Sequence, residues 1–560
     1  MGVLINLEEN IRERWNKALV KGFETKALKT EDLPLFTLEV PKDKKFGDYA
    51  TNIAMVLGKM EGKNPRELAL LLIELFNSIE DKAYINKVEI AGPGFINMYL
   101  DESYLFDIVA EAVRAKSNHG HTSYLKGEKI NLEFVSANPT GLLHMGNARG
   151  AAIGDTLANV LKAIGAEVTK EYYINDAGNQ IENFGKSLDA RYREELGEAE
   201  VEFPADGYHG EDILDTVRGY IALYGDKLLK LNYEERVKAL VEYSLEEKLE
   251  HIKTNLAKFG LVYDVWYKES TIHNSGAVEK TLEELKKKDF IYENEGALWL
   301  KTTALGEEKD EVMVRTNGHP TYFAADIAYH KDKFDRGFDT LINIWGADHH
   351  GHVARMKKAM EAIGYHGDKL EVILMQLVRL FKDGDILRMS KRTGTYVTLE
   401  ELLEEVGVDA ARYFFVMRNP DSHLDFDLDL AKSQSNDNPV YYIQYAHARI
   451  CSILRNLEED VAEYLDEEKV KLTLDIEKDL ALKVGELEKV LVEAGIRREP
   501  YKVAAYALEL ATLFNQFYSS CRVLNEADNI KKNRLKLIMA SKYALENVLK
   551  ILGVSAPERM

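Results

Sequence analysis

With 560 residues, the chain is too long for one compact core, so we expect three or four domains. Its 46% hydrophobic and 30% charged residues are ordinary for a globular protein, and no apolar run is long enough to span a membrane. A net charge of −21 excludes a general nucleic-acid coat protein, and two cysteines exclude a disulfide scaffold. We therefore expect a cytoplasmic protein.

The first 115 residues predict a small α+β domain. Residues 64–79 have the periodicity of an amphipathic helix, and residues 85–100 indicate two strands around a Gly-Pro-Gly turn.

Residues 127–176 predict a strand, a helix and a second strand. The first strand is a short β-rich apolar run within 127–140, and the helix over 147–164 has apolar positions at steps of three and four until Gly165. Residues 166–176 indicate the second strand. Such a unit builds a doubly wound parallel sheet, so we expect a Rossmann-type α/β fold class.

The rest of the chain predicts an insertion and a helical end. Residues from about 185 to 285 are helical and highly charged, and the sheet pattern resumes over 297–303, 320–330 and 340–352. Beyond Asn438-Pro439 only helical patterns remain. We predict an α+β domain over 1–115, an α/β domain with a helical insertion over 116–400, and a helical linker with an all-α domain over 401–560.

The turn after the first strand of the α/β domain carries His144, Gly146 and Asn147. In open α/β sheets, ligands bind at the carboxyl ends of strands near a change in strand order. The following helix start offers free backbone N–H groups and a positive dipole end to a phosphate, and Gly146 allows close approach. The alternative is that Asn147 is a helix cap and His144 an ordinary turn residue.

A second segment, residues 385–394, contains Met389-Ser390-Lys391 in a charged, loop-like stretch. Together with His144-Met145-Gly146-Asn147, it resembles the HIGH and KMSK elements of class I aminoacyl-tRNA synthetases. The resemblance implies that His144, Asn147 and Lys391 are catalytic and stabilise the phosphate oxygens of ATP during adenylate formation. Two positions depart from the pattern, because Asn147 replaces the second His and Arg388 replaces the first Lys.

Further segments resemble arginyl-tRNA synthetases along essentially the whole chain: 46–59, 131–150, 322–330, 343–360 and 408–418, the last similar to the D-A-L-R element with Ala411 in place of Leu. The resemblance implies L-arginine, ATP with Mg²⁺ and tRNA(Arg) as substrates, with no tightly bound cofactor and no membrane partner. It also implies a monomer whose N-terminal domain contacts the tRNA elbow and whose C-terminal domain binds the anticodon loop.

The resemblance also implies the residues of the active site. Glu133 and Asp326 would hold the substrate guanidinium, since carboxylates bind this planar group bidentately. The implied arginine-binding residues are Glu133, Ser136, Asn138, His144, Tyr322, Asp326 and His349. The implied ATP-binding residues are His144, Gly146, Asn147, Gly346, Asp348, His349, Met389, Ser390 and Lys391. The alternatives are an outward-facing strand position for Glu133 and a helix N-terminal acid for Asp326.

Two other residue groups allow competing interpretations. His349, His350 and His352 would suit zinc, but no second ligand cluster has metal spacing, so we expect no metal site. Tyr441, Tyr442 and Tyr445 near Arg449 and Arg455 would stack on unpaired bases and hold phosphates, of which Tyr441, Tyr445 and Arg449 are the expected tRNA-binding residues. An interior helix face is the alternative for these tyrosines.

Two rival functions remain at this point. A different adenylate-forming ligase on the same fold would share both motifs but would not need the helical C-terminal domain. A non-catalytic tRNA-binding relative would lose His144 or Lys391, both of which this chain has.

Overall fold

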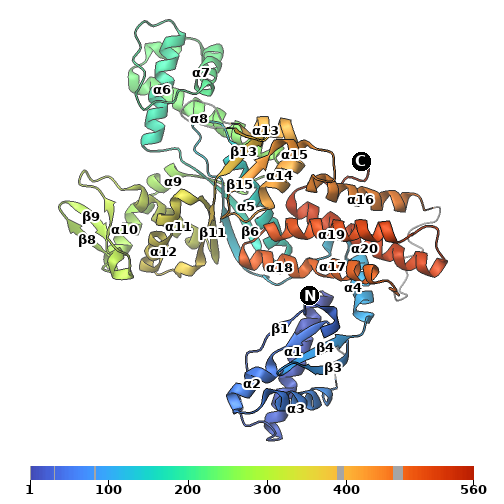
Figure 1. Cartoon of the computed structure of the whole chain (residues 1–560). Coiled ribbons are helices and arrows are strands. Elements are labelled where there is room, and N and C mark those ends of the chain that lie inside the picture. Colours follow the sequence, from blue (N-terminus) through green and yellow to red (C-terminus); the bar gives the residue numbers. More distant parts are fainter. Residues whose placement is uncertain (1, 31, 81–83, 388–396, 458–470) are drawn as a thin grey trace.

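The computed structural model describes residues 2–560 except residue 31 and the segments 81–83, 388–396 and 458–470. Its N-terminal part is an antiparallel sheet with helices packed against it (Figure 1). The strands, in sheet order, are β1 (Leu38–Glu39), β2 (Tyr49–Thr51), β4 (Phe95–Leu100) and β3 (Ile85–Ala91), and the helices are α1 (Val3–Glu24), α2 (Ile53–Glu61) and α3 (Pro65–Asn77). The predicted helix and strand pair are confirmed.

The central sheet has five parallel strands in the order β12-β11-β5-β6-β7. Their bounds are β5 (Lys129–Glu133), β6 (Glu167–Ile174), β7 (Val265–Lys268), β11 (Thr340–Gly346) and β12 (Leu370–Met375). From β5 the chain adds β6 and β7 on one side and then returns to add β11 and β12 on the other. The strand order therefore changes between β5 and β11, where ligands bind in doubly wound sheets.

Apolar side chains bury both faces of this sheet. Ile342 of β11 packs in the same core as α5 (Met145–Ala163), whereas its neighbour Leu341 packs with α11 (Tyr322–Asp335) and α12 (His350–Ile363). Adjacent strand residues point to opposite faces, so helices must cover both faces of a fully buried parallel sheet. The predicted end of α5 is confirmed, because Gly165, at a φ of 102°, follows its last turn.

The inserted helices form a separate unit that projects from the sheet (Figure 1). They are α6 (Asn179–Glu195), α7 (Glu211–Tyr224) and α8 (Tyr233–Lys258), packed on a core of their own. The insertion predicted over 185–285 extends too far, because β7 lies inside that range and is the edge strand of the central sheet. A four-residue strand paired on one side only has too short a pattern to stand out from helical neighbours.

Two small sheets flank the centre. β8 (Ile291–Asn294), β9 (Ala297–Leu300) and β10 (Glu311–Val314) follow α9 (Glu269–Asn274) and α10 (Ala277–Lys287). Residues 297–303 thus contribute to this sheet rather than the central one, and residues 322–330 are helical. β13 (Val378–Lys382), β14 (Asp385–Leu387) and β15 (Leu424–Asp427) form the other sheet, beside α13 (Leu399–Val406), α14 (Val408–Val416) and α15 (Leu428–Lys432). β15 lies within the stretch predicted to be helical.

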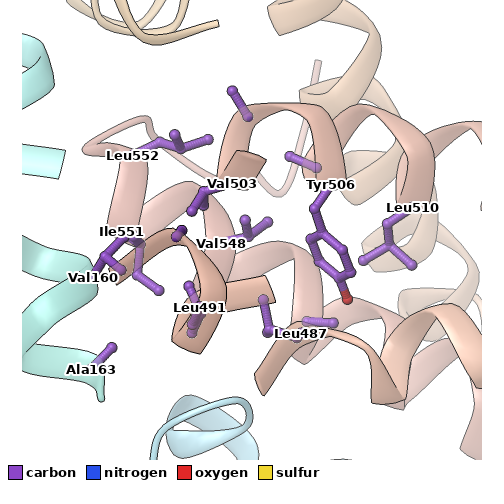
Figure 2. Close-up of a cluster of buried hydrophobic side chains, with 14 of the residues drawn as sticks. Val160, Ala163, Leu487, Leu491, Val503, Tyr506, Leu510, Val548, Ile551 and Leu552 are labelled. Atoms are coloured by element: carbon purple, nitrogen blue, oxygen red, sulfur yellow. The ribbon is translucent and has the colours of Figure 1, made fainter. Parts of the chain in front are cut away.

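The described residues after Pro439 form a helical bundle, as predicted. Its helices are α16 (Pro439–Arg455), α17 (Asp475–Gly485), α18 (Leu487–Arg497), α19 (Tyr501–Ser520) and α20 (Asp528–Leu552). Figure 2 shows Val160 of α5 beside Ile551 of α20, with Leu491 of α18 nearby, so the bundle packs directly on α5. α4 (Ser103–Ala115) joins the N-terminal sheet to α17 and α20. Among the described residues, no helix combines the length and apolar character needed to cross a bilayer.

Candidate active site

A strained bend follows β5 at the change in strand order. Val135 and Ser136 have φ values of 69° and 37°, a region that β-branched residues such as valine seldom adopt. The bend returns the Ser136 hydroxyl to Glu133, where it donates to Oε1 at 3.0 Å, and Ser136 Oγ also accepts from the backbone N–H of Tyr173 at 3.1 Å. The backbone therefore fixes the Glu133 carboxylate at the strand end.

The turn at 144–147 is a helix cap. His144 is the N-cap of α5 and its Nδ1 accepts from Gly146 N at 3.1 Å, while Asn147 Oδ1 accepts from His144 N at 3.1 Å. Because Nδ1 accepts a hydrogen bond, the proton of a neutral His144 is on Nε2. A Cβ on Gly146 would lie 3.0 Å from His144 Cε1, so the glycine makes room for the imidazole.

The expectation of free backbone N–H groups at the start of α5 is wrong. Met145 N donates to Val397 O at 3.3 Å, Gly146 N to the His144 side chain, and Asn147 N to His144 O at 2.9 Å. The capping side chains and the neighbouring segment use the donors that a bare helix start would offer. A phosphate here would meet the helix dipole and side-chain donors instead.

The segment after residues 388–396 is attached to this turn. Leu399 N donates to Leu143 O at 2.8 Å, and His144 forms an isolated β-bridge with Thr398. Met389, Ser390 and Lys391 lie outside the described residues. The described residues that follow this segment, 397–399, are hydrogen-bonded to the His144 turn.

Gly346 is the last residue of β11, the strand beside β5, and Asp348 and His349 follow it. Asp348 and His349 are exposed, and His349 Nε2 is 3.8 Å from Asp348 Oδ2. A Cβ on Gly346 would lie 2.4 Å from Asp348 Oδ1, so a larger residue at 346 would displace the exposed Asp348 side chain. The structure thus places three predicted ATP-binding residues at the strand end next to the His144 turn.

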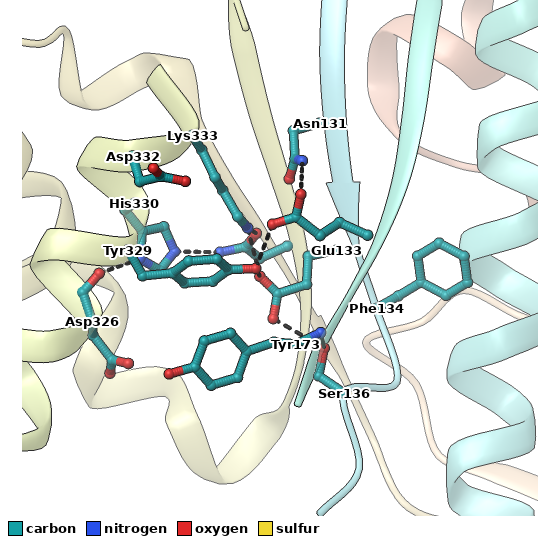
Figure 3. A network of polar contacts seen from close by, with 12 residues as sticks. Asn131, Glu133, Phe134, Ser136, Tyr173, Asp326, Tyr329, His330, Asp332 and Lys333 are labelled. Atoms are coloured by element: carbon teal, nitrogen blue, oxygen red, sulfur yellow. Dashed lines mark hydrogen bonds and ion pairs between the residues drawn. The ribbon is translucent and has the colours of Figure 1, made fainter. Parts of the chain in front are cut away.

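Glu133 is buried, with 8% of its surface exposed, which excludes the outward-facing alternative. Its Oε2 accepts from the Tyr329 hydroxyl at 3.0 Å and from the Lys333 ammonium (Figure 3). Lys333 Nζ also donates to Asn343 Oδ1 at 3.2 Å. The charge of Glu133 is therefore already balanced inside the protein, a pairing that the sequence analysis did not predict.

A second acid, Glu171, lies behind Glu133 and is also paired. Arg336 donates to both of its oxygens, at 2.7 and 2.9 Å, and the Tyr329 hydroxyl is 2.7 Å from Oε1. Burial raises the pKa of Glu171, but Arg336 and Lys333 outweigh it and the pKa is lowered. Two carboxylates and two cations thus make this buried network neutral overall.

Asp326 is more accessible, with 38% of its side chain exposed. It lies in the second turn of α11, so it is not an acid of the first turn. His352 Nε2 is 3.2 Å from Asp326 Oδ2. Burial lowers the pKa of His330 to about 4, and this neutral imidazole donates from Nδ1 to Asp326 O at 2.8 Å and accepts from Asn343 at 2.7 Å.

Tyr173 lies between the two predicted arginine-binding acids, and the sequence analysis missed it. Figure 3 shows its ring between Ser136 and Asp326. Burial, followed by the carboxylates of Glu269, Asp326 and Glu133, raises the pKa of Tyr173, so its hydroxyl keeps its proton. The only available signal was its place near the end of β6, next to β5.

Tyr322 and Asn138 border the site. Tyr322 is 51% exposed. Its hydroxyl lies close to Gly178, since a Cβ added to that glycine would be 3.1 Å from the hydroxyl oxygen. Asn138 is exposed and donates to Gln180 Oε1 at 2.6 Å, so it faces the start of α6 rather than the Glu133 network. Within the described residues, no three His, Cys, Asp or Glu side chains gather as metal ligands would.

The bundle contains a second, basic site around Arg449. The Arg449 guanidinium lies 4.5 Å from the Tyr445 ring centroid and 4.6 Å from that of Tyr518, and it donates to Asn515 at 3.0 Å. Tyr441 and Tyr445 stack at 6.1 Å with an interplanar angle of 7°. A cavity of about 800 Å³ opens here, and its cationic lining consists of Arg449, Arg455, Arg522 and Arg559.

None of the three tyrosines from α16 is fully buried, although Tyr442 packs partly against the core. Tyr518, Arg522 and Arg559 were not predicted, because nothing near them in sequence connects them to Tyr445.

Comparisons with known proteins cover the whole chain. Residues 6–100 match the arginyl tRNA synthetase N terminal domain, residues 109–433 the catalytic domain of class I (R) tRNA synthetases, and residues 443–560 the DALR anticodon binding domain. The arginine–tRNA ligase of Heliobacterium modesticaldum is 54% identical over 99% of this chain and all of the relative. That of Carboxydothermus hydrogenoformans is 55% identical over 95% of this chain and 96% of the relative. In fold, the chain resembles Thermus thermophilus arginyl-tRNA synthetase, with a TM-score of 0.74 and 24% identity over 97% of this chain and 99% of that one.

Proposed function

The chain belongs to the arginyl-tRNA synthetase family, and from this premise we propose which of its residues carry out the reaction. The enzyme activates L-arginine with ATP to arginyl-adenylate and pyrophosphate. It then transfers arginine to the 3′-terminal adenosine of tRNA(Arg) and releases AMP.

We propose that ATP binds where β5 and β11 end. The arginine carboxylate forms a bond to the α-phosphorus, the bond to the β-phosphate breaks, and negative charge gathers on pyrophosphate. His144, with its proton on Nε2, and Asn147 would donate to the phosphate oxygens, beside Gly346, Asp348 and His349. Met389, Ser390 and Lys391 would supply the loop and its cation, with ATP entering as its Mg²⁺ complex.

For arginine, we propose that Asp326 supplies the main charge contact. Its carboxylate is partly exposed, whereas Glu133 is already paired with Lys333. An ionised carboxylate has about four acceptor positions. Three of those on Glu133 are used by Ser136, Tyr329 and Lys333, which leaves about one on Oε1 for a guanidinium N–H.

The hydroxyl of Tyr173 and the side chain of His352 would complete the contacts around the guanidinium. Tyr322 would border the open side of the pocket. Asn138, Ser136, His144 and His349 would face the remainder of the substrate.

We propose that the cavity beside Tyr445 and Arg449 takes the anticodon loop, with Tyr441 extending the stack. Guanidinium groups and exposed aromatic rings bind unpaired bases and their phosphates. The overall charge of −21 makes a local basic cavity necessary. We also propose a monomeric, cytoplasmic enzyme whose N-terminal domain contacts the tRNA elbow, and light scattering would test the monomer.

The observation that carries this proposal is that the His144 turn, at the change in strand order, is hydrogen-bonded to the 397–399 segment. The test is ATP–pyrophosphate exchange with arginine, with and without tRNA(Arg). Arginine-dependent exchange is expected. Exchange that depends on another amino acid would favour a different adenylate-forming ligase, and no exchange in either condition would favour a non-catalytic relative.

A further inference from the structure

The Lys333 side chain is fully buried, and its ammonium contacts Glu133, one of the proposed arginine-binding residues. It bonds Glu133 Oε2 and Asn343 Oδ1 and lies 4.4 Å from the centroid of the Tyr329 ring. Moving a lysine ammonium out of water is costly, and apolar residues in place of a buried ion pair are often at least as stabilising. Stability alone therefore does not explain a lysine at this position. Its contact with Glu133 offers another explanation.

Among the residues that the structure describes, Glu133 forms no second ion pair. The Tyr329 hydroxyl has one proton and two carboxylates within reach, at 2.7 Å for Glu171 and 3.0 Å for Glu133. The hydroxyl proton is shared between the two carboxylates, and Arg336 already balances the charge of Glu171. Burial, followed by both carboxylates, raises the pKa of Tyr329, so this hydroxyl does not ionise. Lys333 is thus the cation on which an ionised Glu133 depends.

The contacts of Lys333 also set the direction of the carboxylate. With the ammonium and the Tyr329 hydroxyl on Oε2, and Ser136 on Oε1, the carboxylate cannot rotate without losing a bond. Oε1 points toward Ser136, at the strained bend after β5 (Figure 3). A substrate guanidinium would therefore meet one oxygen of Glu133 rather than both.

We propose that Lys333 is a positioning residue for arginine selection, which keeps Glu133 ionised and presents Oε1 to the substrate guanidinium. This inference rests on the proposed role of Glu133 in binding arginine. Lys333 itself does not touch the substrate.

The test measures KM for arginine and kcat by exchange in the presence of tRNA, at about pH 6.5 and about pH 8.5. The titratable groups that face Glu133 are Lys333 and Tyr329 from α11, Glu171 and Tyr173 from β6, and Tyr263 before β7. Lys333→Gln keeps hydrogen-bond donors but removes the charge, and burial without a nearby cation disfavours the charged form of a carboxylate.

We expect Lys333→Gln to raise KM for arginine roughly tenfold at the lower pH and less at the higher pH. kcat and KM for ATP should change little. Lys331→Met is the matched control, because Lys331 is on the same helix but pairs with Asp335 at 2.5 Å and Glu284 at 3.6 Å. It should leave KM for arginine unchanged. A Lys333→Gln enzyme with lower thermal stability but a normal, pH-independent KM would overturn the inference.

Glu133→Gln separates this inference from the proposed function. If Glu133→Gln leaves KM for arginine unchanged, the proposed role of Glu133 fails. If it raises KM while Lys333→Gln does not, only the role of Lys333 fails. If Lys333→Gln does not fold, the double variant Glu133→Gln/Lys333→Met, which removes both charges, provides the test. A KM for arginine equal to that of Glu133→Gln alone supports an action of Lys333 through Glu133. A further rise in KM contradicts it.

Discussion

Arg412 and Asp155 form a buried ion pair at 2.6 Å between α14 and α5. Arg412 also donates to Leu552 O at 2.8 Å and to Phe259 O at 3.1 Å, so it joins the helix behind His144 to the last helix of the bundle. Asp409, one turn earlier, accepts from Ser555 N at 2.9 Å. The two charged residues of the D-A-A-R element, Asp409 and Arg412, thus connect α14 to α5 and to the residues at the end of α20.

Arg412→Lys should therefore destabilise the enzyme by about 3 kcal/mol or more, because one ammonium cannot reach all three partners in their fixed directions. Differential scanning calorimetry would measure the loss. Arg418→Lys, an exposed position next to the same helix, should change stability by less than about 0.5 kcal/mol. Equal melting temperatures for the two variants would contradict a structural role for Arg412.

His144→Asn should separate the capping and catalytic roles of His144. Asparagine is a good N-cap but lacks the Nε2–H, so stability should stay within about 1 kcal/mol while kcat in exchange falls roughly 100-fold or more. His144→Ala should lose both the cap and the activity. A near-normal kcat in His144→Asn would show that His144 acts only as a helix cap.

Asp326→Asn should raise KM for arginine roughly 10- to 100-fold with a smaller effect on KM for ATP, since a neutral amide loses the charge contact with the guanidinium. Asp335→Asn is the control on the same helix, where Asp335 pairs with Lys331 away from the pocket. A similar KM in both variants would show that Asp326 does not face the substrate.

Arg449→Met should weaken tRNA(Arg) binding roughly tenfold in a filter-binding assay and reduce its salt dependence, because one cation leaves the cavity. The tRNA-independent binding of ATP should stay unchanged. Arg497→Met, an exposed position on α18, serves as the control. If both variants bind tRNA equally well, the anticodon loop does not use this cavity.

His447 should make stability depend on pH. Burial would lower its pKa, but hydrogen bonds with Cys451, Glu546 and the Pro557 carbonyl raise the pKa of His447 to about 9. A raised folded-state pKa stabilises the enzyme fully below about pH 6.5, and this contribution is lost as pH rises through about 9.

His447→Gln should therefore flatten the fall in melting temperature between about pH 6.5 and about pH 9, whereas a variant of the exposed His319 should retain it. If the melting temperature of His447→Gln falls with pH as steeply as that of the unmodified enzyme, a group other than His447 causes the fall.

The sequence by itself determined the local elements and their order. The helix over α5, the strands β5, β6 and β11, and the helical end after Pro439 follow from periodicity, glycine stops and capping residues, which act between near neighbours. The sequence also placed His144 in the turn between the first parallel strand and the helix that follows it, as the structure has it.

Only the tertiary structure decided which side chains pair. Glu133 meets Lys333 from 200 residues away, and Asp155 meets Arg412 from 257 residues away, at separations where no local pattern indicates contact. The same holds for the N–H groups at the start of α5, one of which is used by Val397 from a distant segment. A buried polar group needs a hydrogen-bond or ion-pair partner, because leaving it unpaired is costly. The fold determines which partner is within reach.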